Sequence, residues 1–444
     1  MRRRTGRSLP GPVSNGAESK RRGCPRSRAR QSRVTLLALA SAGARAYNPH
    51  MSTADRMNFG IFMAPFHRIG DNPTYALRRD LELIEFLDHL SYDEAWIGEH
   101  HSAGYEIIPS PEVFIAAAAE RTRHIRLGTG VCSLPYHHPL ILADRMILLD
   151  HLTLGRAMFG VGPGALPSDA FMMGIDPLRQ REMMDEALEA ILALFRADEP
   201  VTRECGWFTL RDARLHMRPY TRPHMEMAVA AQVSPAGARA AGKYGLGLLS
   251  LGATTAGGFD VLGSQWAVAE EMAAEHGKTV ERARWRMVGP MHIARTMDQA
   301  RADVAFGLAA WVDYFQRVAA LPLVGDATEL GDMIDAMNQT GLAVIGTPDD
   351  AAAQIERLWE KSGGFGTYLF MAHDWADREA TLRSYELFAR FVMPRFQGTL
   401  PRLARSRDWA AENRGTFIGR AVEAIGKAIQ DHAAERAGRT RRTG

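Results

Sequence analysis

The stretch Glu94-Ala95-Trp96-Ile97-Gly98-Glu99-His100-His101 joins an apolar segment to a run of ionisable residues. Residues 94–98 predict a short buried strand, so Glu99, His100 and His101 should follow its carboxyl end. In α/β folds, active sites lie at this end of the strands. Considered alone, two adjacent histidines beside a carboxylate are more often surface residues than a site. A metal site is the weakest interpretation, because no cluster with zinc or iron ligand spacing follows.

Alternating strands and helices extend from this stretch in both directions. Eight apolar segments have strand character, and helix-like segments with 3.6-residue apolar spacing lie between them. The segments are centred on Phe59, Trp96, Leu127, Met158, Val229, Leu248, Val288 and Tyr368. Such alternation predicts a parallel sheet, and eight units match an α/β fold of the TIM-like (β/α)8 barrel type with insertions. An open doubly wound sheet is the alternative, which the missing Gly-x-Gly-x-x-Gly after the first strand disfavours.

Other segments interrupt this alternation. Residues 207–210 and 214–217 alternate apolar and polar side chains, which predicts a hairpin outside the main sheet. We expect a strand over residues 286–294, a single helix over residues 299–319, and a loosely structured apolar insertion over residues 321–342.

The two ends of the chain differ from its middle. Residues 1–50 contain twelve Lys or Arg and one Glu, a net charge of +11; since the whole chain carries +3, the remainder carries −8. The basic balance therefore says nothing about nucleic-acid binding by the folded part. We expect residues 1–50 to be a disordered basic leader, although their apolar run and Ala44-Arg45-Ala46 also resemble an export signal. Residues 57–400 should form the barrel and residues 401–444 a helical, basic tail.

Composition also limits the compartment and the partners. No interior segment has the eighteen or more uninterrupted apolar residues that a membrane helix needs. The three cysteines lie far apart in the sequence, which suits a reducing, cytoplasmic setting. We expect a cytoplasmic homo-oligomer with neither nucleic acid nor membrane as a partner.

If the barrel closes, the residues that follow its strands share one mouth. These residues are rich in glycine and poor in charge, which would let a flat or phosphorylated ligand approach the backbone. Ser234-Pro235-Ala236-Gly237 predicts a serine N-cap with free backbone amides, a suitable seat for phosphate. An ordinary turn at Gly162-Pro163-Gly164 and an ordinary cap at Ser234 are the alternatives.

Several of these motifs, taken together, resemble the bacterial luciferase-like family of flavin-dependent monooxygenases. The motifs are Glu99-His100-His101, Leu127-Gly128-Thr129-Gly130-Val131, Leu134-Pro135-Tyr136-His137-His138-Pro139, residues 149–156, and Gly160-Val161-Gly162-Pro163-Gly164. Residues 64–68, 104–108, 207–212 and 394–397 are similar to limonene-oxidising members of that family. The resemblance spans residues 57–400.

The resemblance implies a luciferase-like barrel that binds reduced flavin, FMN or FAD, supplied by a separate NADH-dependent flavin reductase. His100 and Asp169 fall where the family has a functional histidine and an acidic residue that affects flavin chemistry. Cofactor contacts are implied for Gly130, Val131, Gly162, Gly164, Val233, Ser234, Ala236 and Gly237. Gly130 and Val131 fall on the strand that carries a non-prolyl cis peptide in relatives. Pro163 stands where luciferase has a phosphate-contacting arginine, which leaves FMN and FAD as alternatives.

The resemblance further implies that reduced flavin and O2 form a C4a-hydroperoxide that epoxidises a cyclic monoterpene such as limonene. A histidine near neutrality, His100, would act as acid and base. An apolar substrate pocket, with ordinary core as the equal alternative, is expected from Phe66, Tyr105, Tyr136, Phe171 and Met172, together with residues 321–342. The alternatives are a family member that acts on an alkanal, ketone or sulfonate, and a non-catalytic flavin-binding protein.

Overall fold

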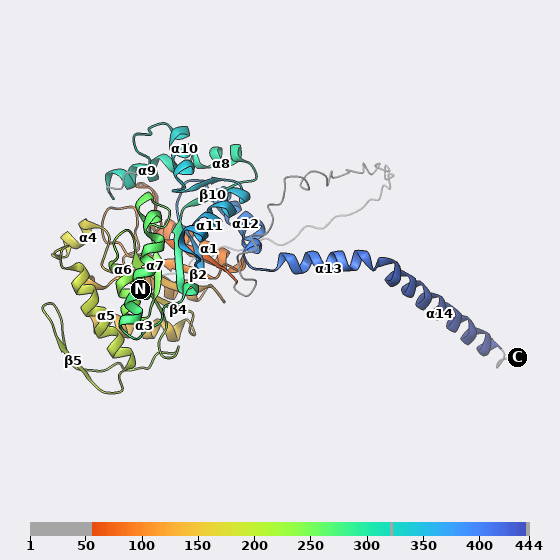
Figure 1. The fold of residues 1–444 in the computed structure, drawn as a ribbon, viewed down its shortest axis with the longest axis horizontal. Helices are drawn as coiled ribbons and strands as arrows, with labels where there is room; N and C mark the ends of the chain where they lie inside the picture. Colours follow the sequence, from red (N-terminus) through yellow and green to blue (C-terminus); the bar gives the residue numbers. More distant parts are fainter. Residues whose placement is uncertain (1–55, 320–322, 441–444) are drawn as a thin grey trace, which may run out of the picture. The chain divides into compact units, whose positions relative to one another are not determined.

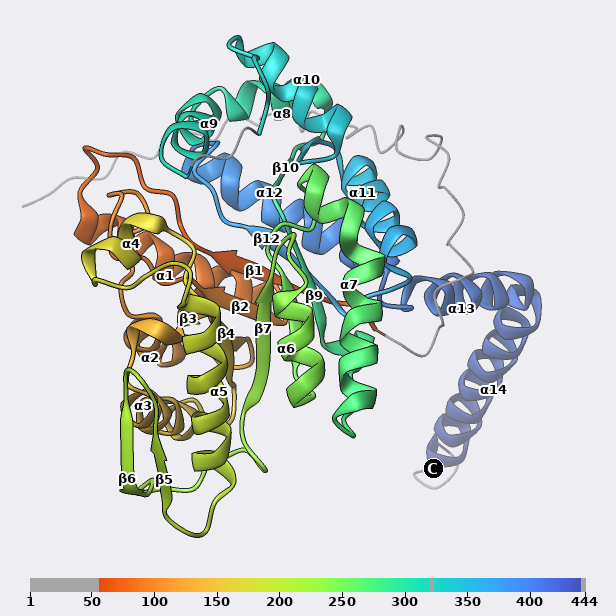
Figure 2. The same cartoon turned by 60° about the vertical axis from the view of Figure 1, so that its left-hand side comes forward.

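A closed barrel of eight parallel strands is the centre of the fold (Figures 1 and 2). The computed structural model describes residues 56–319 and 323–440, so the predicted leader, residues 1–50, lies outside the described residues. Around the barrel, the strands are β1 (Asn58–Met63), β2 (Glu94–Ile97), β3 (Arg126–Ser133), β4 (Ala157–Gly162), β7 (Glu226–Ala231), β8 (Gly247–Ser250), β9 (Trp285–Gly289) and β12 (Thr367–Met371). Each predicted strand centre lies on one of them, so the barrel is confirmed and the open sheet is wrong.

Helices connect successive strands and pack outside the barrel (Figure 2). They are α1 (Pro73–His89), α2 (Pro111–Ala119), α3 (Pro139–Leu152), α5 (Gln180–Arg196), α6 (Ala236–Tyr244), α7 (Ala256–Glu275), α11 (Pro348–Ser362) and α12 (Arg378–Phe391). Proline opens α1, α2, α3 and α11, where its missing N–H costs no helical bond. Short helical turns are η1 (Leu134–Tyr136), α4 (Pro167–Met172), η2 (Arg282–Arg284) and η3 (Met393–Arg395).

Apolar side chains fill the inside of the barrel. This interior cluster consists of Phe62, Trp96, Met158, Ala228, Leu249, Val288 and Leu369. Trp96 is fully buried, and Gly128 on the neighbouring strand makes room for it, since a Cβ there would lie 2.6 Å from the Trp96 ring. The inside of the barrel is therefore a packed core and not a channel.

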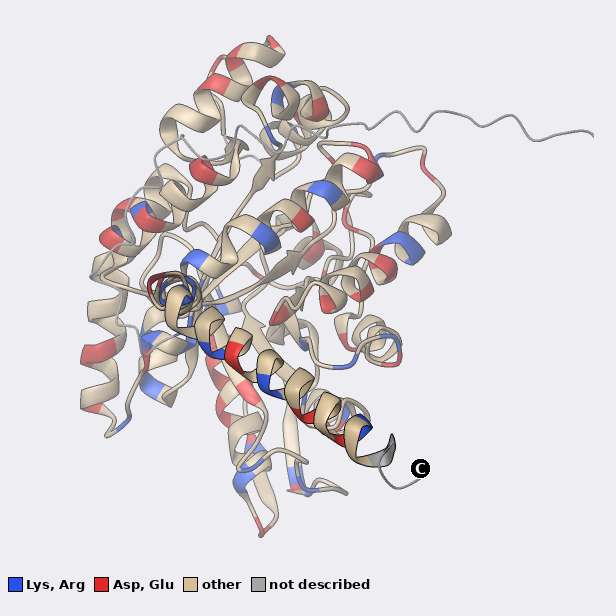
Figure 3. Cartoon of the chain, turned by 90° about the vertical axis from the view of Figure 1, so that its right-hand side faces the viewer, with Lys and Arg blue, Asp and Glu red and all other residues tan. Residues whose placement is uncertain are grey.

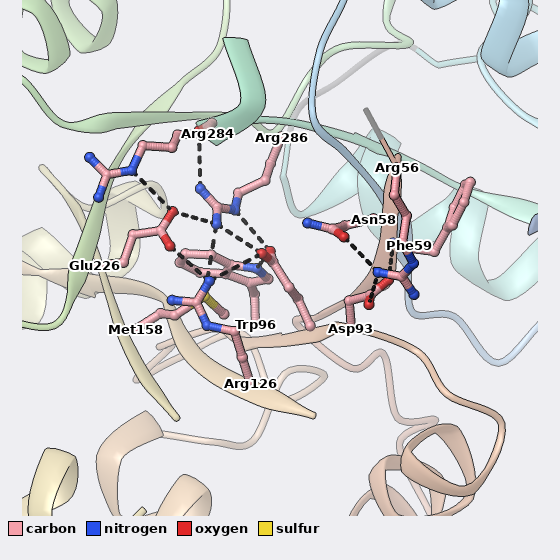
Figure 4. Close-up of polar contacts among 11 residues, drawn as sticks. Arg56, Asn58, Phe59, Asp93, Trp96, Arg126, Met158, Glu226, Arg284 and Arg286 are labelled. Carbon is pink, nitrogen blue, oxygen red and sulfur yellow. Dashed lines mark hydrogen bonds and ion pairs between the residues drawn. The ribbon is translucent and has the colours of Figure 1, made fainter. Parts of the chain in front are cut away.

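A buried charged network, comprising Glu94, Arg126, Glu226 and Arg286, closes the amino-terminal end of the barrel (Figure 4). The Arg286 guanidinium binds Glu94 through two hydrogen bonds, of 2.8 and 2.9 Å, and Glu226 through one of 2.7 Å, while lying over the Trp96 ring. Burial alone would raise the pKa of Glu226, but Arg286 and Arg126 lower it to about 2. Since this end is filled, a ligand has to approach from the carboxyl ends of the strands.

An insertion between β9 and β12, residues 290–347, departs from the predictions. The predicted strand over 286–294 is wrong, because Pro290 ends β9 and the next strand, β10 (Met291–Ile293), leaves the barrel to pair with β11 (Val344–Gly346). The predicted helix over 299–319 is two helices, α8 (Met297–Val304) and α9 (Leu308–Arg317), which Gly307 separates. With α10 (Leu330–Thr340) they lie together beside β10 (Figure 2) and form a second hydrophobic cluster. The prediction of a loose segment over 321–342 is therefore wrong for residues 323–342, while residues 321 and 322 lie outside the described residues.

The predicted hairpin exists, but its strands are placed differently. β5 (Val201–Glu204) pairs antiparallel with β6 (Thr209–Ala213), outside the barrel. The prediction of a strand over 214–217 is wrong, because the partner of β6 precedes it in the sequence.

Two helices, α13 (Leu400–Glu412) and α14 (Arg414–Thr440), follow the barrel. Both basic and acidic residues lie along α14 (Figure 3), and none of the side chains described from residue 397 onward is buried. Between residues 56 and 440, leaving aside 320–322, the protein has no helix with the length and apolar character required to traverse a bilayer.

Candidate active site at the carboxyl end of the barrel

The loop after β2 folds back on itself and brings Glu106 to His100. The His100 amide donates to the carbonyl of Ile108 over 3.1 Å, and Phe66 in the loop after β1 pairs with Glu106 in an antiparallel bridge. The chain reverses where Ala103 and Gly104 adopt positive φ angles, of 69° and 78°. This reversal brings the side chains of His100 and Glu106, six residues apart in the sequence, into contact.

His100 lies between two carboxylates. Its Nε2 atom is 2.6 Å from Glu106 Oε2, and its Nδ1 atom is 3.5 Å from Asp169 Oδ2. All three side chains are largely buried. Burial alone would lower the pKa of His100, but the charge of Glu106 and the contact with Asp169 raise it to about 10. The two carboxylates thus favour the protonated form of His100, whereas the sequence predicted a histidine near neutrality.

The structure brings Asp169, which was predicted from sequence, into direct contact with His100. Asp169 belongs to α4, and it accepts hydrogen bonds from the His101 amide, over 3.2 Å, and from the Ser102 hydroxyl. Ser102 also contacts Ser168, with 2.6 Å between the two hydroxyl oxygens. Burial would raise the pKa of Asp169, but its contacts with His100 and Ser102 lower it. Asp169 therefore ties α4 to the loop that carries His100.

Sequence reasoning missed two members of this site, Glu106 and Tyr314. Tyr314 lies on α9 of the insertion, is 1% exposed, and donates a hydrogen bond from its hydroxyl to Glu106 Oε1 over 3.2 Å. Burial and the charge of Glu106 raise the pKa of Tyr314. Glu106 lay inside a segment quoted for its family resemblance, but no pattern in the sequence indicated its contact with His100.

A second cluster lies beside the first. Glu99, whose side chain is fully buried, accepts hydrogen bonds of 2.8 Å from both His101 and His137, and one of 2.7 Å from the Ser133 amide. Burial would raise the pKa of Glu99, but the two histidines lower it. The interpretation of His100 and His101 as plain surface residues is wrong, since buried carboxylates hold both.

The residues predicted to contact the flavin ring lie at the mouth of the barrel. The peptide bond between Gly130 and Val131 is cis. Val131 packs against the interior cluster together with Ala64, Leu251 and Met371, and these four partly buried side chains form an apolar floor. Gly162 adjoins this floor, because a Cβ there would lie 2.7 Å from a Val131 methyl group. Gly164 has φ of +95° and lies against the Tyr136 hydroxyl, so only glycine fits.

The predicted phosphate seat is at the start of α6. Val233, Ser234 and Pro235 are exposed, Ala236 is half-buried, and Gly237 is buried against the carbonyl of Ala230. Pro235 is the N-cap and no side chain caps the helix, so the prediction of Ser234 as N-cap is wrong. The first backbone amides of a helix have no intrahelical acceptor, so this end can still bind an anion.

The predicted apolar pocket is only partly supported. Phe66 stacks on Tyr105 with ring centroids 5.0 Å apart, and Tyr105 contacts Tyr314, so the first two belong to the packed insertion cluster. Phe171 and Met172 are 84% and 61% exposed on α4, and their place in the substrate pocket stays a prediction. Tyr136 is half-buried next to His101, and burial raises its pKa to about 12.

The fold is thus an α/β barrel, and His100 lies at its mouth between two carboxylates. The chain belongs to the luciferase-like monooxygenase family, whose model matches residues 57–365. The expected fold and enzyme class are thereby confirmed.

Particular relatives cover most of the chain. It is 49% identical to limonene 1,2-monooxygenase of Rhodococcus erythropolis, over 86% of this chain and 96% of the relative. It is 46% identical to 4-hydroxyprotoasukamycin monooxygenase of Streptomyces nodosus subsp. asukaensis, over 81% and 97%. Among solved structures, the oxygenating constituent of 3,6-diketocamphane monooxygenase from Pseudomonas putida, in complex with FMN, matches with a TM-score of 0.64 and 26% identity, over 76% of this chain and 98% of that one.

Proposed function

We propose that the protein is the oxygenase component of a two-component flavin system and that it epoxidises a cyclic monoterpene such as limonene. The observation that carries the catalytic part is the position of His100 between two carboxylates at the mouth of the barrel. The relative at 49% identity, which bears the name limonene 1,2-monooxygenase, supports the substrate.

The residues at the mouth fit a flavin, FMN or FAD. The apolar floor around Val131 suits a flat ring. We assign Gly130, Gly162 and Gly164 to the same site, where the lack of side chains lets Trp96, Val131 and Tyr136 pack closely against the backbone. We assign the phosphate to the start of α6, with the backbone of Val233, Ser234, Ala236 and Gly237 around it. The phosphate assignment rests on the start of α6, where no side chain caps the helix and the first backbone amides have no intrahelical acceptor.

Bound reduced flavin would supply the two electrons with which O2 is cleaved, so that one oxygen atom enters the alkene and the other leaves as water. The positive charge of His100 would favour an electron-rich ring next to it. His100 would also hold a proton at Nδ1 or Nε2 for the departing oxygen, while Asp169 keeps its ring in place. The apolar floor would exclude water.

A separate NADH-dependent reductase would supply the reduced flavin. The name of the solved relative, which calls it an oxygenating constituent, supports a second component. A cytoplasmic location and a homo-oligomeric state belong to the same proposal.

Turnover with isotopic oxygen tests this function. The full-length protein would receive NADH, a flavin reductase, FMN or FAD in separate reactions, limonene and 18O2, and the products would be identified by gas chromatography and mass spectrometry. We expect limonene 1,2-epoxide carrying one 18O atom. Absence of oxygenated product with both flavins would exclude the epoxidase, and flavin binding without turnover of any substrate would favour a flavin carrier.

His100→Ala tests the assigned residue. We expect the variant to consume NADH and release hydrogen peroxide in place of epoxide, because the proton and the charge at the site are lost. His138→Ala is the matched control, since His138 is exposed and its side chain caps no helix. Coupled turnover by His100→Ala would refute its role.

Oxygenation of a different substrate is the second candidate. The 46% identical relative bears the name of a monooxygenase for 4-hydroxyprotoasukamycin, so a similar sequence need not share limonene as its substrate. A panel of alkanals, ketones and sulfonates in the same assay would identify such a substrate by its 18O label.

A further inference from the structure

Among the residues that the structure describes, His100 Nε2 pairs with Glu106, and the other side-chain partner of the Glu106 carboxylate is Tyr314 in the insertion. Glu106 Oε2 has His100 as its ion-pair partner, and Glu106 Oε1 accepts the hydrogen bond from Tyr314. The insertion is the segment that the eight-unit barrel does not require. A connected chain of three side chains therefore joins it to the proposed catalytic residue.

We propose that Glu106 is a positioning residue that keeps His100 oriented and cationic, and that Tyr314 fixes Glu106, so that the insertion sets the state of the active-site histidine. Only the catalytic readout of this inference rests on the proposed function; the state of His100 can be measured without flavin.

Glu106 is better placed than Asp169 to control the charge of His100. The His100–Glu106 distance is 2.6 Å, against 3.5 Å for His100–Asp169. Asp169 Oδ1 accepts hydrogen bonds from Ser102 and from the His101 amide, so much of its charge is directed to the loop backbone. Glu106 has no basic partner other than His100 in the part of the chain that the structure describes. Its charge is therefore directed at the imidazole.

The other groups around the pair do not replace Glu106. Tyr314 faces Glu106 from α9 with a neutral hydroxyl, and the rings of Tyr105, Phe66 and Tyr314 contact one another. His101, next in the chain, has Glu99 as its ion-pair partner. Removal of the Glu106 charge would thus leave Asp169 as the only carboxylate in contact with His100 within the described residues.

Packing positions Tyr314, and part of that packing comes from Phe66 and Tyr105 in the loops after β1 and β2. Tyr314 is buried with Phe66, Tyr105 and Trp311 in the insertion cluster, and its ring centroid lies 4.6 Å from that of Tyr105. Because α9 is anchored in that cluster, the Tyr314 hydroxyl restricts the orientation of the Glu106 carboxylate. Loss of the hydroxyl alone should weaken the hold on Glu106 without removing its charge.

Histidine NMR on the flavin-free, full-length protein tests the inference directly. The protein would be labelled with 13C- and 15N-histidine, His100→Gln would assign the His100 resonance, and its titration would be followed from pH 5 to 11. We expect Glu106→Gln, which preserves side-chain size, to lower the titration midpoint by about one to three pH units, the usual effect of removing an adjacent opposite charge. Glu106→Asp should recover part of that shift, and Tyr314→Phe should produce a smaller one.

Glu82→Gln is the control for losing a carboxylate, since Glu82 is half-exposed and pairs with Arg378 on the outer helices. It should leave the His100 midpoint unchanged. An unchanged midpoint in Glu106→Gln would overturn the inference, and so would a larger shift in Asp169→Asn than in Glu106→Gln. If Glu106→Gln does not fold, as judged by circular dichroism, Glu106→Asp and Tyr314→Phe still decide: two unshifted midpoints would overturn it.

The catalytic readout separates this inference from the proposed function. In the coupled assay, the alkaline limb of the pH profile for epoxide per NADH should move to lower pH in Glu106→Gln, while KM for limonene stays unchanged. A wild-type protein that makes no epoxide refutes the proposed function but leaves the NMR test standing. An active wild type and a Glu106→Gln variant with the same pH profile would overturn the positioning role.

Discussion

Replacing Arg286 by methionine should destabilise the barrel strongly. The side chain is 2% exposed, and it is the only cation that makes hydrogen bonds to Glu94 among the described residues. Removing it leaves the Glu94 carboxylate, 1% exposed, with Arg126 at 3.9 Å and the Trp96 N–H as its remaining partners. Breaking a buried ion pair in this way costs about 3–5 kcal/mol of unfolding free energy.

Two further variants separate the charge effect from simple loss of a side chain. Arg284→Met removes a half-exposed arginine that lies 3.8 Å from Glu226, and it should cost less than about 1 kcal/mol. The double variant Glu94→Gln with Arg286→Met should recover part of the loss, because the uncompensated charge is gone and the glutamine oxygen can still accept from Trp96.

Urea unfolding followed by circular dichroism at pH 7 and fixed protein concentration would measure these differences from the midpoint and slope of the transition. Equal losses in Arg286→Met and Arg284→Met would refute the reasoning. The same conclusion would follow if the double variant were no more stable than Arg286→Met.

Three further predictions concern pH and the C-terminal helices. The folded-state pKa of Glu226 is lowered from 4.5 to about 2, so its stabilising contribution is present above pH 4.5 and is lost as the pH falls towards 2. A plot of Tm against pH should show this loss in the wild type but not in Glu226→Gln. Parallel curves for the two proteins would contradict the prediction. The folded-state pKa of His100 is raised from 6.5 to about 10, so its stabilising contribution is complete below pH 6.5 and is lost as the pH rises through 10. Over this range, the Tm of the wild type should fall towards that of His100→Gln. A constant difference in Tm between the two proteins would count against the ion pair. Truncation after residue 398 removes no buried side chain from the described part of the chain. In the urea assay it should change the unfolding free energy by less than about 0.5 kcal/mol. A larger loss would mean that α13 or α14 packs on another surface.

The barrel could be predicted from the sequence because its signals are local. Each strand is a short apolar run, as around Trp96 and Tyr368, and alternation with helices leaves few topologies. The insertion was harder. Pro290 and Gly307 are single residues that divide a continuous apolar pattern into separate elements, and periodicity does not register such breaks.

The site could be predicted only where it follows the strands directly. His100 and Asp169 are next to elements whose ends converge, so their meeting follows from the fold. The contact of Glu106 with His100 depends on the reversal at Ala103 and Gly104, and that of Tyr314 on tertiary packing 208 residues away from Glu106. Arg286 was missed for a related reason: a charged residue near the start of a strand is normally solvated, and nothing local indicates that Glu94 and Glu226 surround it.

The charged network at the closed end of the barrel has a consequence for how this enzyme can diversify. The charged side chains that link β2, β3, β7 and β9 lie at the end remote from the mouth, whereas the mouth is built from loops and from the insertion. Loops at the mouth can therefore be replaced, by evolution or by design, while the strands beneath them remain clamped. A change of substrate in this scaffold therefore needs no change in the charged network at the amino-terminal end of the barrel.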